Sequence, residues 1–510
     1  MRTFSLIVTV VLLSVQCNSQ SDIDGKNDVV EIKVNSEITF QTIENFGASD
    51  AWSCQFVGKW PDEQKNRVAD LLFSVEENAD GSPKGIGLSC WRFNIGVGSA
   101  DQKGETKIND PWRRTECFLQ QNETYNWEKQ AGQRWFLKAA KQRGVESFVG
   151  FVNSPPVWLT KNGRTNSDGG NSMNLPKENL AKFSEFLIEV TKNIHQNEGI
   201  LFDYLSPVNE PQWDWKDGQE GSPWTNTEIA QLCRQLGNDL QKSGLSTKIS
   251  ITDAGQLNHL YDRGNDAERG FQIREFFSKQ SGNYICDVPN MAHKIAGHSY
   301  FTTTNNKVLN EVRTKLLNEI EKVDPELEFW MSEYCILGDN DGFKGNGRDL
   351  GMETALFVAN VIHADLTIAN ASAWQWWLAV SPYNFKDGLV YIDKSETGGN
   401  IYESKLLWAV GNYSRFIRPG AKRISVETVE NAGLKTSAFQ NRDGSLVVVI
   451  INRSRENKSV HFKNLSADLK TVAELYETSE NKSLSKRGKV KLNEPQSFPG
   501  QSICTLVITP

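Results

Sequence analysis

The sequence predicts an α/β fold, a closed (β/α)8 barrel of the TIM type with an appended antiparallel β-sandwich. Between residues 44 and 420, short apolar runs alternate with amphipathic helical stretches eight times, a pattern typical of a parallel sheet closed into a barrel. After residue 420 only short strand-like runs separated by turn signals remain, as in an antiparallel sandwich. Val29–Phe40 has the same strand pattern, so we expect this N-terminal strand to join the C-terminal sheet.

The predicted barrel strands are short runs of apolar residues, many of them β-branched or aromatic. They are Phe46–Asp50, Ser89–Ile95, Ser147–Asn153, Phe202–Asn209, Lys248–Asp253, Lys294–Tyr300, Glu328–Glu333 and Ala371–Trp377. Helical spacing of apolar residues marks Trp127–Arg143, Leu180–Gln196, Thr227–Lys242, Val308–Val323, Met352–Ile368 and Ser404–Ile417. A doubly wound open sheet is the alternative, but its Gly-rich first turn does not match Gly47-Ala48-Ser49-Asp50.

The predicted sandwich strands are Ile424–Val429, Leu434–Gln440, Ser445–Ile451, Val460–Phe462, Val472–Tyr476 and Ser502–Ile508. The resulting domain organisation is a signal peptide at 1–20, a barrel at 44–420, and a side domain made of 28–43 and 421–510. The signal consists of Arg2, the mostly apolar run Phe4–Val15 and a polar exit. We therefore expect a periplasmic or secreted protein, or one that is lipid-anchored at the cell surface through Cys17.

Composition excludes several classes of protein. The formal net charge is −7 and no long Lys/Arg block is present, so nucleic acid and acidic membrane surfaces are poor partners. The apolar run of the signal is too short to span a bilayer, and no later segment is a better candidate. The six His show no metal-ligand spacing and the Cys are scattered without a Cys-x-x-Cys pair, so we expect neither a metal, nor another cofactor, nor a disulfide framework. Most of the 15 Trp are expected in the core.

Polar and aromatic residues gather at the predicted carboxyl ends of the strands, where a barrel of this type carries its active site. They are Asp50, Arg92, Asn94, Asn153, Asn209, Glu210, Asp253, His298, Tyr300, Glu333 and Trp376. Glu210 ends the fourth strand and Glu333 the seventh, so the two should face each other across the barrel mouth. Two facing carboxyls can cleave a glycosidic bond, because one protonates the leaving oxygen while the other attacks or activates water.

The motifs around these residues resemble glycoside hydrolase family 30, within the large clan of retaining (β/α)8 glycosidases. Asn209-Glu210-Pro211 and Trp330-Met331-Ser332-Glu333-Tyr334 look like the acid/base and nucleophile motifs of that clan. The wider pattern is similar to family 30 at Phe46–Ala51, Asn153–Leu159, Gly297–Tyr300, Trp374–Trp377, Asp443–Ile450 and Phe498–Val507. The resemblance implies Glu333 as nucleophile and Glu210 as acid and then base.

The same resemblance implies a sugar site made of Asp50, Arg92, Asn153, Asn209, His298, Tyr300 and Trp376. Arg92 could instead form a structural ion pair, and His298 could orient other groups. Tyr300 is expected to donate to Glu333 and keep it ionised, while repulsion from Glu333 should raise the pKa of Glu210. Possible sugar platforms, or plain core, are Trp158, Trp213, Trp215 and Trp377.

The substrate remains open among β-1,6-galactan, β-1,6-glucan, glucuronoxylan and glucosyl lipids. Gly47–Gly58 looks most like the branch that cleaves β-1,6-galactan side chains, and Ala48 stands where the glucosylceramidase branch carries a second Gly. A non-catalytic carbohydrate-binding protein would keep the aromatic residues but lose a carboxylate. A Ser or Cys hydrolase would need a nucleophile elbow or a Cys–His set that the sequence lacks. The sequence does not determine endo or exo action, or the oligomeric state.

Overall fold

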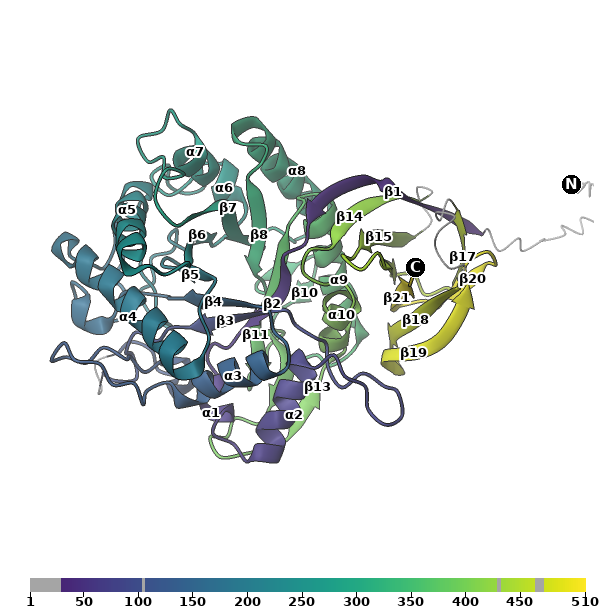
Figure 1. Cartoon of the computed structure of the whole chain (residues 1–510), viewed down its shortest axis with the longest axis horizontal. Helices are drawn as coiled ribbons and strands as arrows, with labels where there is room; N and C mark the ends of the chain where they lie inside the picture. The colour runs from purple at the N-terminus through teal and green to yellow at the C-terminus, as the bar shows by residue number, and fades with distance from the viewer. Residues whose placement is uncertain (1–28, 103–105, 429–432, 464–471) are drawn as a thin grey trace, which may run out of the picture.

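The computed structural model describes residues 29–102, 106–428, 433–463 and 472–510 of the chain. Figure 1 shows two parts, a barrel ringed by helices and a domain made of strands, joined at the top of the view by the purple N-terminal strand. The predicted signal segment and Cys17 lie outside the described residues. Within the described ranges, no helix is both long enough and apolar enough to span a membrane, and the seven cysteines there are all free.

Eight parallel strands close into the predicted barrel. They are β2 (Asn45–Ser49), β3 (Cys90–Asn94), β4 (Ser147–Phe151), β5 (Tyr204–Ser206), β6 (Lys248–Ala254), β7 (Met291–His298), β8 (Glu328–Glu333) and β11 (Ala373–Ser381). Each strand pairs with the next, and β11 closes the ring by pairing with both β8 and β2. These strands read as apolar runs because a parallel sheet is covered on both faces. Every residue of β2, β3 and β11 is buried.

Helices cover the outside of the barrel, as expected from their apolar stripes. The longer ones are α2 (Asp62–Phe73), α3 (Ala131–Gln142), α4 (Leu180–Glu198), α5 (Asn226–Ser243), α8 (Asn306–Val323), α9 (Met352–Thr367) and α10 (Lys405–Ser414). The start of α5 is fixed by a capping box between Thr225 and Glu228. Shorter helices are α1 (Cys54–Val57), α6 (Asn258–Tyr261) and α7 (Gln272–Phe277).

Four short strands lie at the barrel mouth and were not predicted. β12 (Gly388–Ile392) pairs in parallel with the far end of β11, and β13 (Ile401–Glu403) pairs antiparallel with β12. β9 (Asp339–Asn340) and β10 (Phe343–Lys344) form a hairpin soon after β8. Both additions follow strands that end at the active-site face, so they build on its rim.

The side domain is a nine-stranded, mostly antiparallel sheet that includes the N-terminal strand. It consists of β1 (Val30–Thr42), β14 (Lys422–Thr428), β15 (Leu434–Gln440), β16 (Leu446–Asn452), β17 (Lys458–Lys463), β18 (Val472–Ser479), β19 (Lys482–Lys491), β20 (Gln496–Phe498) and β21 (Ser502–Ile508). The prediction that the N-terminal strand joins this sheet is confirmed, since β1 lies between β14, antiparallel, and β17, parallel. Strands from both ends of the sheet share one apolar core, so the sheet folds over itself as a sandwich.

The other face of the side domain packs on the barrel. Phe439 of β15 and Val447, Val449 and Ile451 of β16 belong to the same apolar cluster as the barrel core. Strand β1 runs out of the side domain and directly into β2 of the barrel, as Figure 1 shows. The two parts are therefore joined both by apolar packing and by the direct connection from β1 of the side domain to β2 of the barrel.

Candidate active site

Glu210 and Glu333 meet at the mouth of the barrel. Glu333 is the last residue of β8, and Glu210 lies in the segment that follows β5. Both side chains are buried. One carboxylate oxygen of each, together with one ring nitrogen of His298, lies within 4.8 Å of the others. The strand order therefore brings two glutamates that are far apart in the sequence close enough to contact the same small part of a ligand.

Donors on both oxygens hold the carboxylate of Glu333. The Tyr300 hydroxyl donates to Oε1 at 2.9 Å, and Nη1 of Arg92 donates to Oε2 at 3.0 Å. Arg92 is almost completely buried and lies over the ring of Phe151 at 4.3 Å. Charge-assisted hydrogen bonds of this kind bind an anion best. The expected contact from Tyr300 is present, and Arg92, considered above as a structural ion pair, pairs directly with Glu333.

Asp253, at the end of β6, organises the floor of the site; it was predicted at a strand end but was given no role. It accepts hydrogen bonds from the hydroxyls of Ser206 and Ser332, each at 2.5 Å, and from Nη2 of Arg92 at 3.3 Å. Its backbone oxygen also accepts the N–H of Glu210 at 2.8 Å. Burial acts to raise the pKa of Asp253, but its charged and hydrogen-bonding contacts, of which the Arg92 guanidinium is the strongest, hold that pKa well below its usual range. A permanent anion therefore anchors Arg92 beneath Glu333.

The backbone of Glu210 is held in an unusual conformation. Its φ is +45° and that of Asp253 is +47°, a left-handed region that side chains with a Cβ rarely adopt. The N–H of Glu210 bonds to Asp253, and its carbonyl oxygen accepts from Nε1 of Trp215 at 3.0 Å. Such conformations cost about 1–3 kcal/mol each and persist where the surroundings impose them. Here they aim the Glu210 side chain at Glu333.

His298, the last residue of β7, is the side-chain partner of Glu210. Its Nδ1 lies 2.8 Å from Oε1 of Glu210 and 3.5 Å from Oε1 of Glu333. Burial lowers the pKa of His298, but the carboxylate of Glu333 and the contacts with Asp253 and Glu210 outweigh it and raise the pKa to about 10. The ring is therefore a buried cation at neutral pH, and Nδ1 donates to Glu210.

Burial, and not the neighbouring carboxylate, is the main cause of the unusual pKa of Glu210. Burial raises this pKa to about 7, while the hydrogen bond and charge of His298 oppose the increase. Repulsion from Glu333 adds a smaller contribution of the expected sign. The expected repulsion from Glu333 is therefore present, but burial, which the sequence did not reveal, contributes more to the raised pKa of Glu210.

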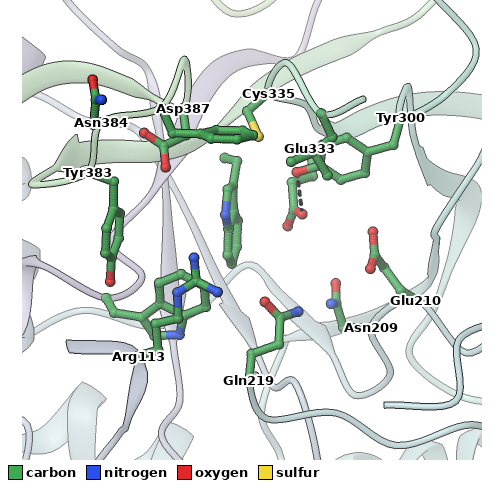
Figure 2. Close-up of a pocket in the computed structure, with 14 residues that line it drawn as sticks. Arg113, Asn209, Glu210, Gln219, Tyr300, Glu333, Cys335, Tyr383, Asn384 and Asp387 are labelled. Atoms are coloured by element: carbon green, nitrogen blue, oxygen red, sulfur yellow. Dashed lines mark hydrogen bonds between the residues drawn. The ribbon is translucent and has the colours of Figure 1, made fainter. Parts of the chain in front are cut away.

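The two glutamates open into a cavity of about 390 Å3, a size typical of ligand pockets. Figure 2 shows Glu210, Asn209 and Tyr300 on one side and a polar wall on the other. Of the predicted residues, those that line this cavity are Asn209, Glu210, Tyr300, Glu333 and Trp377. The lining residues that sequence reasoning missed are Trp52, Arg113, Gln219, Cys335, Leu337, Tyr383, Asn384, Phe385 and Asp387.

Arg113 and Asp387 are the charged groups of this opposite wall. The Arg113 guanidinium lies over the rings of Trp52, at 5.4 Å, and Tyr383, at 5.2 Å. Burial raises the pKa of Asp387 to about 6, and its Oδ1 has no hydrogen-bond donor in the part of the chain that the structure describes. Arg113 also lines a neighbouring cavity of about 660 Å3 with Lys107 and others. Arg113 therefore borders both cavities.

Five of the seven predicted sugar contacts do not line the cavity. Arg92 and His298 instead contact the two glutamates, and the other three are Asp50, Asn153 and Trp376. Asp50 accepts the N–H of Asn94 at 2.7 Å, and burial raises its pKa to about 8. Asn153 is 3% exposed and Trp376 is fully buried, and neither belongs to the cavity lining. The indole N–H of Trp376 donates to the backbone oxygen of Asp387 at 2.7 Å. Successive side chains of a strand point to opposite faces, so Trp377, and not Trp376, faces the cavity.

The remaining candidate platforms have other partners. Trp158 donates to the backbone oxygen of Leu119 at 3.0 Å, away from the cavity lining. Trp213 packs edge-on against Phe301, with ring centroids 6.2 Å apart. Trp215 supports the backbone of Glu210, as described above. Trp377 is thus the candidate that the structure places in the pocket.

A metal is not required to explain this arrangement. Among the described residues, one group has spacing suited to an ion, namely Glu210, His298 and Glu333. The shared His298 nitrogen is already hydrogen-bonded to Glu210, and the raised pKa makes the ring a cation, which is not the neutral form that binds metals. The expectation of a reaction without a metal or other cofactor therefore stays a prediction.

Comparisons with known proteins agree on one family. A model of O-glycosyl hydrolase family 30 matches residues 29–391, and a model of the glycosyl hydrolase family 30 beta sandwich domain matches residues 420–506. An endo-beta-1,6-galactanase from Hypocrea rufa is 23% identical over 439 residues, covering 82% of each chain. The crystal structure of a conserved exported protein from Bacteroides fragilis is 33% identical, with a TM-score of 0.87 over 93% of this chain and 99% of that one.

A second solved structure supports the fold. The catalytic domain of the family 30 xylanase C from Talaromyces cellulolyticus is 24% identical and superposes with a TM-score of 0.69, over 94% of this chain and 100% of that one. This similarity extends across both the barrel and the side domain.

Proposed function

Because the chain belongs to glycoside hydrolase family 30, we propose that it hydrolyses a β-linked polysaccharide by double displacement with retention of configuration. A carboxylate oxygen of Glu333 attacks the anomeric carbon while Glu210 gives its proton to the departing glycosidic oxygen, so that the C–O bond breaks and a glycosyl ester forms. Glu210 then removes a proton from water, which attacks the anomeric carbon and releases Glu333.

The short distance between the glutamates is the observation that carries this proposal. One oxygen of each lies within 4.8 Å of the other. Retaining enzymes hold their carboxyl groups about 5–5.5 Å apart, whereas inverting enzymes need about 6.5–9.5 Å to admit a water molecule between carboxylate and sugar. The spacing therefore favours direct attack by Glu333.

The surroundings of the two groups support different roles for them. Glu333 receives donors from Tyr300 and Arg92, which suits an anionic nucleophile. With a pKa of about 7, Glu210 carries its proton in a large fraction of molecules at neutral pH, as an acid must. Once Glu333 becomes an ester, the negative charge that repels a second carboxylate disappears, so the pKa of Glu210 falls and Glu210 can act as base.

We assign β-1,6-linked galactan as the substrate, with β-1,6-glucan, glucuronoxylan and glucosyl lipids as alternatives. The name of the Hypocrea rufa relative and the sequence of residues 47–58 both favour the galactan. A neighbouring cavity on the other side of Arg113, beside Lys107, gives room for a chain longer than one sugar.

A substrate panel tests the proposal. Purified protein is incubated with β-1,6-galactan, β-1,6-glucan, glucuronoxylan and aryl β-glycosides, and the anomer first released is followed by proton NMR. We expect β-1,6-galactan to be cleaved fastest, with the β-anomer formed first. An α-anomer formed first would contradict retention, and faster cleavage of another polysaccharide would contradict the substrate assignment.

Export is the last part of the proposal. The first twenty residues have the pattern of a signal peptide, and the Bacteroides fragilis relative is described as an exported protein. N-terminal sequencing of the mature protein should begin within or shortly after residues 17–21. Labelling with a radioactive fatty acid distinguishes lipid attachment at Cys17 from simple release.

A further inference from the structure

A second large cavity lies on the far side of the segment that follows Glu333. Its volume is about 700 Å3, and it lies between the barrel and the side domain. The barrel contributes residues from the start of α8, from α9 and from the β9–β10 hairpin, including Asn306, Asn360 and Phe343. The side domain contributes Arg453 and Arg455 from the turn after β16. The cavity is therefore assembled only where the two domains meet.

A buried amide in this cavity has an unused acceptor. Asn360 of α9 is 4% exposed. Its Nδ2 donates to Oδ1 of Asn306 at 3.2 Å, but within the described ranges no donor reaches its Oδ1. A buried polar atom without a partner costs about 1–3 kcal/mol. A ligand hydroxyl that donates to this oxygen would remove that cost.

The charges around the cavity are mixed. In the described part of the chain neither Arg453 nor Arg455 forms an ion pair, and the wall also carries the four carboxylates of Asp341, Asp349, Glu353 and Glu480. A polyanion would meet these carboxylates, so the wall does not suit nucleic acid or a sulfated chain. Guanidinium, amide and carboxylate groups together offer donors and acceptors to the hydroxyls of a neutral ligand.

An aromatic surface completes the wall. The ring of Phe343, in the β9–β10 hairpin, stacks on that of Phe357 with centroids 4.9 Å apart, and both line the cavity. Phe343 is only partly buried. The Lys386 ammonium lies 5.3 Å from its ring centroid, so the C–H groups of a sugar would contact the part of the ring that remains exposed. Ligand sites typically combine such apolar surface with a few polar groups that fix orientation.

We propose that this cavity binds a stretch of the substrate polysaccharide outside the catalytic pocket, an inference that rests on the function proposed above. The segment after Glu333 separates the two sites. Cys335 and Leu337 line the catalytic pocket, whereas Asn340 and Phe343 line the second cavity. Polysaccharide held in the second cavity would therefore contact the loop that shapes the first.

A hydrogen-bonded chain connects the second cavity to Tyr334, the residue next to the nucleophile in the sequence. Thr303, which lines the cavity, donates to Oδ1 of Asn340 at 2.9 Å, and its hydroxyl lies 2.9 Å from that of Tyr334. Tyr334 directly follows Glu333, and its ring lies 6.0 Å from that of Tyr300. Polysaccharide bound in the second cavity would raise the local concentration of substrate near the catalytic pocket, and it would contact a hydrogen-bonded chain that ends beside Glu333.

Kinetics with long and short substrates test the proposal. We compare kcat/KM on the polysaccharide that the panel identifies with kcat/KM on an aryl β-glycoside too short to reach the second cavity. In the double variant Arg453→Ala/Arg455→Ala, kcat/KM on the polysaccharide divided by kcat/KM on the aryl glycoside should fall about tenfold. This fall is equivalent to roughly 1.4 kcal/mol of lost binding. Phe343→Ala should lower the same ratio. The matched control is Arg442→Ala, an exposed arginine of the side domain beside Gly420 at the opposite end of the barrel.

Direct binding separates this inference from the proposed function. Full-length Glu333→Gln protein, which cannot turn over, is titrated calorimetrically with oligosaccharides of the same linkage. Two binding events are expected, with one of them lost when Arg453→Ala/Arg455→Ala is added. A single event that this double change leaves intact would overturn the second site, as would saturable binding of Ca2+ or Mg2+ there without sugar. Failure of the proposed function instead appears as no hydrolysis of any polysaccharide in the panel.

Discussion

Replacing the buried cation beside the acid should move the pH profile of the enzyme. In His298→Gln the positive charge disappears, while the amide side chain can still donate to Glu210. The His298 hydrogen bond and charge both lower the pKa of Glu210, so their loss raises it. Glu210 acts while protonated, and activity is lost as pH rises through its pKa. The alkaline limb of kcat/KM should therefore move to higher pH.

The size of the shift follows from the geometry. Nδ1 of His298 lies 2.8 Å from Glu210, and an opposite charge at such short range changes a carboxyl pKa by about 1–3 units. With a pKa of about 7 in the parent protein, about one-tenth of Glu210 is protonated at pH 8. A shift of about two units raises that fraction to about nine-tenths.

The assay is kcat/KM between about pH 5 and pH 9 on an aryl β-glycoside whose leaving group needs protonation. The position of the limb, and not the absolute rate, is compared, since His298→Gln also removes a charge near Glu333. The control is His293→Gln, which changes a partly exposed histidine at the other end of the same strand, paired with Asp324. An alkaline limb that stays in place or moves to lower pH would refute the assigned roles.

Three further outcomes are expected. Glu333→Gln should lose turnover on every β-glycoside, whereas Glu210→Ala should still form the glycosyl-enzyme from aryl glycosides with good leaving groups, and azide should accelerate its second step; recovery of an α-configured azide adduct would contradict the roles. Arg313→Met should lower the free energy of unfolding by about 3–5 kcal/mol in denaturant titrations, because it leaves buried Asp365 without its 2.8 Å ion pair; a loss below about 1 kcal/mol would count against that network. Prolonged dialysis against EDTA should leave kcat unchanged, and a loss restored by a divalent cation would show that the expectation of no metal is wrong.

The barrel could be predicted because its signals are local. Each strand is a short apolar run and each helix has a periodic apolar face, and all eight predicted barrel strands appear within a few residues of their expected positions. The rim strands β9, β10, β12 and β13 were missed, since two- to five-residue strands lack a periodic signal. Their pairing depends on contacts that form only after the barrel closes.

The site could be predicted only where it sits on strand ends. Glu210, His298 and Glu333 follow or end strands, so sequence position alone brings them together. Tyr383 and Asp387 were missed because β11 runs on to Ser381, past the predicted end at Trp377. Both residues follow the true end of the last barrel strand, so a correct strand end would have placed them at the active-site face.

Other differences have no local signal. Arg113 lies in the long connection between β3 and α3, which carries no periodic pattern. The exchange of Trp376 for Trp377 reflects side-chain alternation on β11, together with a register shift against β2 between Trp376 and Leu378. A one-residue irregularity reverses which side chain faces the pocket, and the sequence gives no warning of it.

The position of β1 has a consequence for how the chain is made. Ile32 pairs with Thr428, so the first described strand must await partners synthesised about 400 residues later. At about 5–20 residues per second, that wait is on the order of 20–80 s. During it, β1 is an unpaired strand edge of the kind that recruits other chains.

A fragment that ends before β14 would keep this edge permanently. Such a fragment, starting at residue 29, should therefore aggregate during expression even if its barrel closes. A fragment that starts after Thr42 and also ends before β14 lacks the unpaired strand β1. It exposes only the apolar surface of the barrel that the side domain covers in the full chain. The position at which a gene encoding this fold is truncated thus decides whether the product has an unpaired strand edge or only an exposed apolar surface.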